Sequence, residues 1–381
     1  MRAVLIASAF VLVSCGAAAQ APQPPQPPQV AARAYVVSDL TSGQVLSQHN
    51  ADERVEPASL TKLMTAYLVF AAMREGRIAP GQQVQVSANA RQAPGSRTFL
   101  EAGSSVSVDT LVRGMVVQSG NDACVALAEV LAGSEEAFAQ HMNREAARLG
   151  MQNTQFTNAT GLPHAQHYST ARDLGLLAAA LIRDFPEAYA RYYQMKEFRH
   201  NDITQMNRNR LLWLDPSVDG VKTGFTEGAG YCLIASSARG GRRLLTVLLG
   251  ADSDAARARE SQKLLNWGYQ YFDGVRLYEP GQTVKAVHVW KGANEAVAAG
   301  FEQGLVVTVP KGEAQHLAAE LLTHPPVLAP ISKGDKVGVL RVALAGRPLG
   351  EYPVVALEGV PQGGILGRAW DTLRLWLKQR G

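Results

Sequence analysis

Residues 56–73 read EPASLTKLMTAYLVFAAM, and we expect the rest of the chain to be organised around them. Pro57 stands where a helix would begin, and strong helix formers follow it. Apolar residues recur at helical spacing on two sides of this segment, which predicts a helix that is apolar nearly all round. Such a helix belongs in the middle of a core rather than on a surface.

One charged residue, Lys62, interrupts this segment between Glu56 and Arg74. It follows Ser59 in the spacing S-x-x-K, and residues three apart share one face of a helix. Burial lowers the pKa of a lysine, and a neutral amine beside a hydroxyl is a base beside a nucleophile. The pattern alone is common by chance, but lysine is rarely buried without a reason. We therefore interpret Ser59 and Lys62 as a candidate catalytic pair.

Length and composition indicate the number of domains and the class of protein in which this pair lies. The 381 residues exceed one typical core and predict two domains. The composition is that of an ordinary globular protein, and the net charge of +4 gives no sign of nucleic-acid binding. No basic run with interleaved aromatic residues is present.

The N-terminus predicts export. Residues 1–19 have a charged start, a short apolar run and a small-residue cleavage site near Ala19, as in a secretory signal. The sequence around Cys15 also resembles a bacterial lipobox, which would place a lipid on that cysteine. We favour simple cleavage because the alanine site is good. Residues 20–32 are rich in proline and glutamine and are expected to form a spacer outside the core.

The cysteines and histidines predict no disulfide framework and no metal. Cys124 and Cys232 lie in apolar runs and are expected to be buried free thiols. The histidines show no ligand spacing, so we predict neither a metal nor another cofactor. His164 and His167 fall in a loop near the candidate site, but we interpret both as structural or solvated.

We predict that residues 33–274 form a catalytic domain of mixed α/β (α+β) type. Strands at 33–39 and 43–48 read as a hairpin, and helices follow in the middle of the segment. Three strands between 218 and 249 and a helix at 255–272 close it. The first and last strands must then meet in one central antiparallel sheet beside a helical subdomain.

The remainder of the chain changes character. Residues 275–360 contain short valine-rich runs separated by Gly and Pro, which predicts a small all-β domain of sandwich type. Residues 361–381 predict an amphipathic helix with two tryptophans on its apolar side. This pattern favours a helix lying in a membrane interface. The alternative is a helix that packs on the β domain with the same apolar side buried.

Three motifs stand in order along the chain. They are Ser59-Leu60-Thr61-Lys62, Ser119-Gly120-Asn121 and Lys222-Thr223-Gly224. The ordered set resembles that of penicillin-binding proteins and class A β-lactamases. Four longer segments resemble the D-alanyl-D-alanine carboxypeptidases, low-molecular-weight penicillin-binding proteins on the periplasmic side of the bacterial inner membrane. They are EPASLTKLMTAY, VQSGNDACVALAE, NRNRLLW and VDGVKTGFTEGAGYCL.

The resemblance runs from about Ala34 to the C-terminus and implies a β-lactamase-like domain followed by a β-rich domain. It also implies roles for the first two motifs. Ser59 would attack the carbonyl of the penultimate D-alanine of a peptidoglycan stem pentapeptide, and Lys62 would take its proton. Ser119 would relay a proton to the leaving amine, and Asn121 would line the same side. β-Lactams would act as inhibitors.

The third motif would bind the substrate strand. By the same resemblance, Lys222 would keep the site positive and favour neutral Lys62 through like-charge repulsion. Thr223 would bind the terminal carboxylate, and Gly224 would let the substrate strand lie against the sheet. Phe225 stands where family members often carry histidine. Its backbone N–H, with that of Ser59, would form the oxyanion hole.

An arginine partner for the substrate carboxylate is also expected. Arg208 and Arg257 are equal candidates, and each could instead be an ordinary surface residue. The resemblance further implies a protein on the periplasmic face of the inner membrane, held peripherally by lipid contacts of the C-terminal helix.

Two other functions compete. A class A β-lactamase would carry Glu-x-x-Leu-Asn between its second and third motifs, and no glutamate between Asn121 and Lys222 has that context. The second motif is also Ser-Gly-Asn rather than the Ser-Asp-Asn of lactamases. An inactive cell-wall-binding homologue would keep the fold only, but all three motifs are intact.

Overall fold

A computed structural model describes residues 25–323 and 326–378. The predicted signal segment and the alternative lipid site lie outside these residues. The described chain forms two compact units. The larger is Gln26–Gln282 with Phe301–Lys311, and the smaller is Thr283–Gly300 with the described part of Gly312–Gly381.

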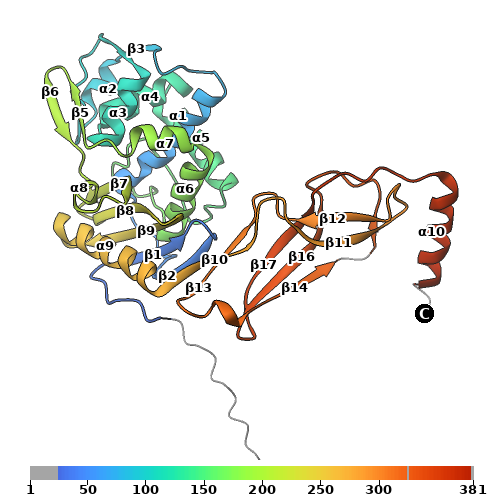
Figure 1. Ribbon diagram of the computed structural model, residues 1–381. Coiled ribbons are helices and arrows are strands. Elements are labelled where there is room, and N and C mark those ends of the chain that lie inside the picture. Colours follow the sequence, from blue (N-terminus) through green and yellow to red (C-terminus); the bar gives the residue numbers. More distant parts are fainter. Residues whose placement is uncertain (1–24, 324–325, 379–381) are drawn as a thin grey trace, which may run out of the picture. The chain divides into compact units, whose positions relative to one another are not determined.

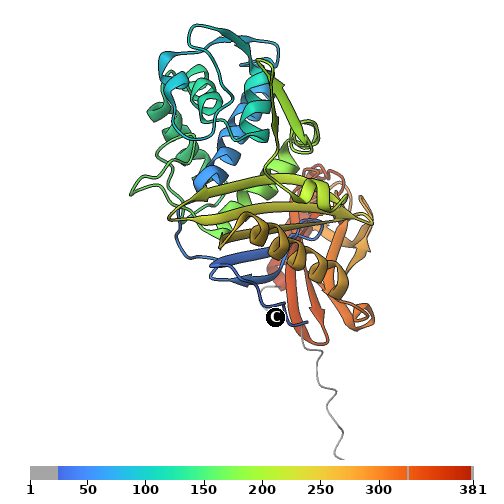
Figure 2. The same ribbon diagram turned by 90° about the vertical axis from the view of Figure 1, so that its left-hand side faces the viewer.

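The larger unit is built on a five-stranded antiparallel sheet (Figures 1 and 2). The N-terminal strands pair with the last strands of the unit, which confirms the predicted closure of one central sheet. Helix α9 (Asp254–Tyr271) covers one face, and α6 (Ala171–Asp184) packs on the other. The strand order is β2 (Gln44–His49), β1 (Ala34–Asp39), β9 (Arg242–Ala251), β8 (Gly230–Arg239) and β7 (Val218–Thr226).

A helical region surrounds α1 (Lys62–Arg74), which follows a 3-10 turn, η1 (Ala58–Thr61). Most side chains of α1 are buried on all sides, as its apolar pattern predicted. Serine or threonine caps begin α2, α3, α5, α6 and α9 by accepting an N–H of the first turn. The remaining helices are α2 (Ala88–Gln92), α3 (Val108–Val117), α4 (Asn121–Ala132), α5 (Glu135–Arg148), α7 (Pro186–Tyr192) and α8 (Leu211–Leu214).

Two small two-stranded sheets lie at the edge of this region and were missed from the sequence, because their strands are short and mostly polar. They are β3 (Gln83–Gln85) with β4 (Ser105–Ser107), and β5 (Glu197–His200) with β6 (Ile203–Met206). Cys124 and Cys232 are buried free thiols, as predicted.

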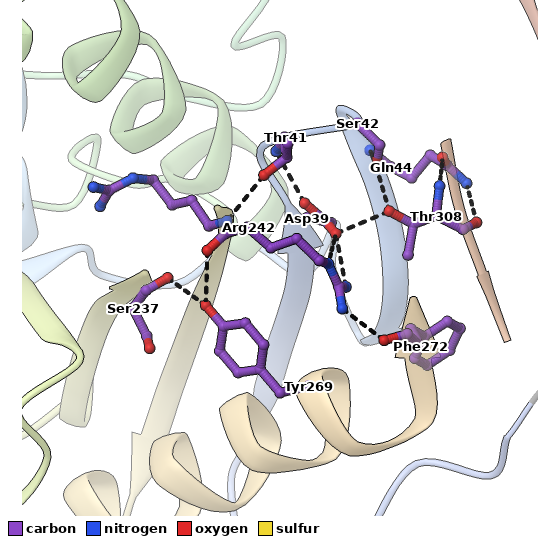
Figure 3. A network of polar contacts seen from close by, with 10 residues as sticks. Asp39, Thr41, Ser42, Gln44, Ser237, Arg242, Tyr269, Phe272 and Thr308 are labelled. Carbon is purple, nitrogen blue, oxygen red and sulfur yellow. Dashed lines mark hydrogen bonds and ion pairs between the residues drawn. The ribbon is translucent and has the colours of Figure 1, made fainter. Parts of the chain in front are cut away.

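The larger unit continues past the predicted end of the catalytic domain. Strand β10 (Phe272–Tyr278) pairs with β13 (Leu305–Pro310), although the sequence pattern had grouped β13 with the β domain. The reason is a polar network between β13 and the β1–β2 hairpin (Figure 3). The carboxylate of Asp39, which is fully buried, accepts from Arg242 at 2.8 Å and from Thr308 Oγ1 at 2.8 Å. We call this group, with Gln44, the Asp39 network.

Gln44 and Arg242 extend the Asp39 network. The side chain of Gln44 makes two hydrogen bonds with the backbone of Thr308. Its Oε1 accepts from the backbone nitrogen at 2.6 Å, and its Nε2 donates to the carbonyl oxygen at 2.9 Å. Arg242 also donates to the carbonyl of Phe272 at 2.6 Å (Figure 3). The network therefore ties both strands of the β10–β13 ribbon to the central sheet.

Part of the predicted spacer is also bound to the larger unit. Trp267 Nε1 donates to the carbonyl of Gln26 at 2.9 Å, and Lys263 donates to the carbonyl of Gln29 at 3.0 Å. Val30 and Ala32 pack against the core cluster beneath α9. The expectation that this segment stays outside the core is wrong for its last residues, because side chains of α9 satisfy its backbone carbonyls.

The smaller unit is all β apart from short helical segments, as predicted. Its described strands form one six-stranded sheet. The sequence pattern missed β12 and β14, because alanine fills most of β12 and alanine and leucine most of β14, with few β-branched residues in either. Helix α10 (Ile365–Lys378) follows the sheet. The strand order is β14 (Leu317–Thr323), β16 (Lys336–Leu344), β17 (Arg347–Ala356), β12 (Ala296–Gly300), β11 (Thr283–Trp290) and β15 (Val327–Leu328).

Helix α10 presents its apolar side away from the sheet. Leu366 is 87% exposed and Trp370 is 61% exposed, whereas the polar Asp371 accepts the N–H of Lys291 at 2.6 Å. Arg374, also on the polar side, lies over the ring of Trp290. The alternative in which packing on the β domain buries the apolar side is therefore wrong. Within the described part of the chain, no helix has the length and apolarity needed to cross a membrane.

Candidate active site

The S-x-x-K motif spans the junction of η1 and α1. Ala58 has a φ of +49°, so the backbone enters this turn in a conformation that is uncommon for a residue with a side chain. The spacing of three residues then brings Ser59 and Lys62 to the same face, and Lys62 Nζ donates to Ser59 Oγ at 2.9 Å.

Lys62 is a buried amine held by neutral oxygens. Its side chain is among the largest that are fully buried, and Nζ also donates to the carbonyl of Thr160 at 2.6 Å. Burial, with a smaller contribution from the positive charge of Arg208, lowers the pKa of Lys62 to about 8. The amine is thus poised to exchange a proton with Ser59 near neutral pH.

The carbonyl of Thr160 belongs to a loop at residues 157–168, which sequence reasoning missed as part of the site. Asn158 Oδ1 accepts the N–H of Gly161 at 2.7 Å and that of Thr160 at 3.1 Å, which shapes the loop. Gly161 has a φ of +85°, and a Cβ there would meet the carbonyl oxygen of Ala58 at 1.8 Å. Because the loop passes so close to the Ala58 carbonyl, position 161 requires glycine. The run from Asn158 to Gly161 was therefore the sequence signal that could have indicated this loop as part of the site.

The Ser-Gly-Asn motif forms the opposite wall. Ser119 has a φ of +67°, and its Oγ accepts from Lys222 Nζ at 3.0 Å. Asn121 is the first residue of α4, whose N-cap is Gly120, and no side chain caps this helix. The side chain of Asn121 donates to the carbonyl of Pro94 at 2.6 Å, and its buried Oδ1 has no partner in the described structure. A substrate N–H would satisfy that oxygen.

The third motif lies on strand β7. Lys222 is 3% exposed, and burial, together with the charge of Lys62, holds its pKa well below the usual range. A Cβ on Gly224 would lie 3.3 Å from the carbonyl oxygen of Pro57, so β7 passes close against η1. The three motifs therefore meet although more than 160 residues separate the first from the last.

The two candidate arginines occupy different environments. Arg257 is buried, and its guanidinium donates to the carbonyl of Gly224 at 3.0 Å and to the carboxylate of Asp254. Its charge lies over the ring of Tyr231. Arg208 is exposed and forms no hydrogen bond or ion pair with the described residues. Arg208 thus keeps its donors available, whereas those of Arg257 are largely used within the protein.

Phe225 is 49% exposed beside these arginines, and its ring centroid lies 4.4 Å from that of Tyr231. Eight of the ten predicted site residues line a single cavity of about 690 Å³, and Lys62 and Lys222 lie behind Ser59 and Ser119. The eight are Ser59, Ser119, Asn121, Arg208, Thr223, Gly224, Phe225 and Arg257. Gly95, Ser96, Thr160, Asn207 and Tyr231 line the same cavity without having been predicted.

Comparison with known proteins finds two family models that match the chain. A family model described as D-alanyl-D-alanine carboxypeptidase matches residues 19–253, and one described as the C-terminal domain of penicillin-binding protein 5 matches residues 272–362. The chain is 42% identical to D-alanyl-D-alanine carboxypeptidase DacC of Escherichia coli, over 100% of this chain and 96% of that protein. It is 39% identical to DacA of the same organism, over 90% of this chain and 87% of that protein.

Solved structures give the same result. Penicillin-binding protein 5 from Haemophilus influenzae aligns with a TM-score of 0.83 and 38% identity, over 88% of this chain and 99% of that one. Penicillin-binding protein D2 from Listeria monocytogenes, in its ampicillin-bound form, aligns with a TM-score of 0.56 and 32% identity. That alignment covers 63% of this chain and 98% of that one.

Proposed function

Because the chain belongs to the D-alanyl-D-alanine carboxypeptidase family, we propose that Ser59 is the nucleophile and Lys62 the base of its reaction. The protein is a serine-type peptidase that removes the terminal D-alanine from peptidoglycan pentapeptides and is acylated by β-lactams. The observation that carries the residue assignment is the buried Lys62 amine, 2.9 Å from Ser59 Oγ at the wall of the cavity.

Acylation begins when Ser59 Oγ attacks the carbonyl carbon of the penultimate D-alanine and Lys62 accepts the hydroxyl proton. The hydrogen bond from Lys62 Nζ to the Thr160 carbonyl keeps the amine directed along the cavity wall. The backbone N–H groups of Ser59 and Phe225 stabilise the oxyanion that forms. The free Oδ1 of Asn121 accepts an N–H of the bound peptide.

Expulsion of the last D-alanine requires a proton on its nitrogen. Ser119 relays it: the hydroxyl of Ser119, which lies in the cavity wall and is held by Lys222 Nζ at 3.0 Å, gives its proton to the nitrogen and regains the proton that Lys62 took from Ser59. Lys62 is then neutral again. Water then enters as the second nucleophile, and Lys62 again acts as the base. The trimmed peptide leaves, and Ser59 regains its proton.

The terminal carboxylate of the substrate selects the end of the peptide. Arg208 and Thr223 line the cavity, and we assign them to that carboxylate because Arg208 has free donors. Arg257 contributes positive charge and holds the Gly224 carbonyl, so its contribution is to the shape of strand β7.

The decisive test compares wild type with Ser59→Ala on a pentapeptide ending in D-Ala-D-Ala, with and without penicillin. We expect Ser59→Ala to release no D-alanine and to form no covalent adduct with a fluorescent penicillin, at an unchanged thermal midpoint. Ser105→Ala removes an exposed hydroxyl on β4 and serves as the control. Covalent labelling of a folded Ser59→Ala protein would remove Ser59 from the role.

The same site should hold β-lactams rather than turn them over. Among the described residues that line the cavity there is no glutamate, and the carboxylate that does line it, Asp254, is paired with Arg257 and Arg210. We therefore expect no carboxylate to activate a deacylating water in the way a class A β-lactamase requires. We expect a burst of one penicillin bound per protein, followed by hydrolysis that is slow compared with acylation. Rapid, sustained penicillin hydrolysis would favour the lactamase function instead.

For location, we infer an exported protein held peripherally on the periplasmic face of the inner membrane through α10. The support is the exposed apolar side of α10, with Ile365, Leu366, Trp370 and Leu377 each more than half exposed. The polar side, through Asp371 and Arg374, is used against the β domain. An apolar helix side of this kind is suited to the headgroup boundary of a bilayer. Cleavage near Ala19 remains our prediction for the N-terminus.

A further inference from the structure

His167 is a buried histidine that touches the first motif from behind. It is 3% exposed, and its Nε2 lies 2.8 Å from Thr61 Oγ1. The backbone N–H of Thr157 donates to Nδ1 at 3.1 Å. Since Nδ1 is the acceptor, Nε2 carries the ring hydrogen and donates it to Thr61. Thr61 lies between Ser59 and Lys62, directly before Lys62, and has no role assigned above.

The histidine closes the 157–168 loop. It belongs to the end of this loop and accepts from Thr157 at the loop's start, so one ring joins both ends. Between these ends, the Thr160 carbonyl accepts from Lys62 at 2.6 Å and the Ala159 carbonyl accepts from Thr65 at 2.7 Å. The loop therefore contacts α1 through two carbonyls and the last residue of η1 through one imidazole.

We propose that His167 is a positioning residue, which fixes the 157–168 loop to Thr61 and thereby directs Lys62 Nζ at Ser59 Oγ through the Thr160 carbonyl. The proposal deepens the proposed function and rests on it. A loop carbonyl can orient an amine only if the loop itself is held relative to the helix that carries the amine. His167 supplies that link at Thr61, one residue before Lys62.

The surroundings keep the imidazole neutral, as this role requires. Burial, reinforced by the neighbouring His164 and Lys62, lowers the pKa of His167 to about 4. The ring of Phe156 packs edge-on against it at 5.7 Å between centroids. A neutral ring retains both its acceptor toward Thr157 and its donor toward Thr61 over the working pH range.

Two substitutions of His167 distinguish its hydrogen bond to Thr157 from its hydrogen bond to Thr61. An asparagine amide reaches the position of Nδ1, so His167→Asn keeps the bond to Thr157 and loses the one to Thr61. A glutamine amide reaches the position of Nε2, so His167→Gln keeps the donor to Thr61. His164→Asn changes an exposed histidine of the same loop and is the matched control.

The experiment measures stopped-flow acylation by a fluorescent penicillin, which separates the dissociation constant of the initial complex from the acylation rate constant. We expect His167→Asn to lower the rate constant by roughly 10- to 100-fold, because a displaced base loses its alignment with the nucleophile. The dissociation constant should stay within about twofold, since the carboxylate site is untouched. His167→Gln should recover most of the rate at the same thermal midpoint as His167→Asn.

The positioning role of His167 is overturned if His167→Asn has the same acylation rate constant as His164→Asn. It is also overturned if His167→Asn and His167→Gln lower the acylation rate constant equally. Failure of the proposed function would look different, because wild type itself would then fail to form an adduct on Ser59. Mass spectrometry of the labelled wild-type peptide separates the two results.

Discussion

Lys62 shows how a single buried group can carry the chemistry of a site. Its amine sits among neutral oxygens, with Ser59 at 2.9 Å and Thr160 at 2.6 Å. Among the residues that the structure describes, no carboxylate accepts a hydrogen bond from this amine, so folding disfavours its protonated form. Burying the amine costs folding stability, but the same burial lowers its pKa and so makes it a usable base near neutral pH.

The pH dependence of acylation should report this amine. Only the deprotonated form of Lys62 accepts the serine proton, so the second-order rate constant for penicillin acylation should rise with pH and level off above about 8. Well below that pH, each unit should change the rate constant about tenfold. The check is a profile of acylation rate against pH at constant ionic strength, and a flat profile would contradict it.

Lys62→Arg is the matched variant for this profile. A guanidinium keeps the charge but does not deprotonate in a protein, so we expect activity close to that of Lys62→Ala at every pH. Near-normal acylation by Lys62→Arg would mean that another group is the base.

At the scale of elements, the Asp39 network joins the β1–β2 hairpin, the end of α9 and the β10–β13 ribbon. Arg242 and Thr308 lie 203 and 269 residues from Asp39 in the chain. A carboxylate that accepts from so many donors in a buried place cannot be replaced by an amide without leaving donors unsatisfied. This network explains why β13 lies with the larger unit.

We expect Asp39→Asn to lower the free energy of unfolding of the larger unit by roughly 3 kcal/mol, because it removes one partner of a buried ion pair. Thr308→Val is the control and should cost only about 1 kcal/mol, since it removes one neutral hydroxyl with little change of shape. Urea unfolding followed by circular dichroism measures both. Equal losses in the two variants would show that the charge of Asp39 contributes nothing.

At the scale of the whole molecule, we propose that helix α10 decides where the protein resides. Its polar side contacts the β domain and its apolar side is exposed, so the residues that we propose to bind the membrane stay accessible. Peripheral binding is the expected mode, since one side of the helix is polar.

Removal of α10 should separate location from catalysis. A protein truncated after Val360 should keep full activity on small peptides and lose binding to vesicles of phosphatidylethanolamine and phosphatidylglycerol. In the full chain, the pair Leu366→Gln and Leu373→Gln should weaken vesicle binding at least about 10-fold, because two leucines no longer enter the bilayer boundary. Sedimentation with vesicles measures both.

Leu375→Gln is the control within α10, because Leu375 lies on the opposite side and is only half-buried. It should change vesicle binding much less than the leucine pair. If the truncated protein still binds vesicles, the anchor lies elsewhere, and a lipid on Cys15 becomes the leading candidate.

The sequence by itself determined the local elements and the chemistry of the motifs. The spacing of apolar residues and the composition identified the buried helix after Ser59, the strands around Lys222 and the amphipathic end of the chain. They could do so because the spacing of apolar residues along a segment shows which face of a helix or strand is buried. The S-x-x-K spacing fixed the Ser59–Lys62 contact, since residues three apart share a face in any helical turn.

Only the tertiary structure decided which distant groups complete the site. Thr160 lies 98 residues from Lys62, and His167 lies 106 residues from Thr61, and neither loop position carries a periodic signal. The tertiary structure also distinguishes the two arginines, because Arg257 donates to the Gly224 carbonyl and to Asp254 whereas the donors of Arg208 remain available. It likewise decides which side of α10 contacts the β domain. Such contacts depend on how loops and elements pack, and packing between distant segments leaves no pattern along the chain.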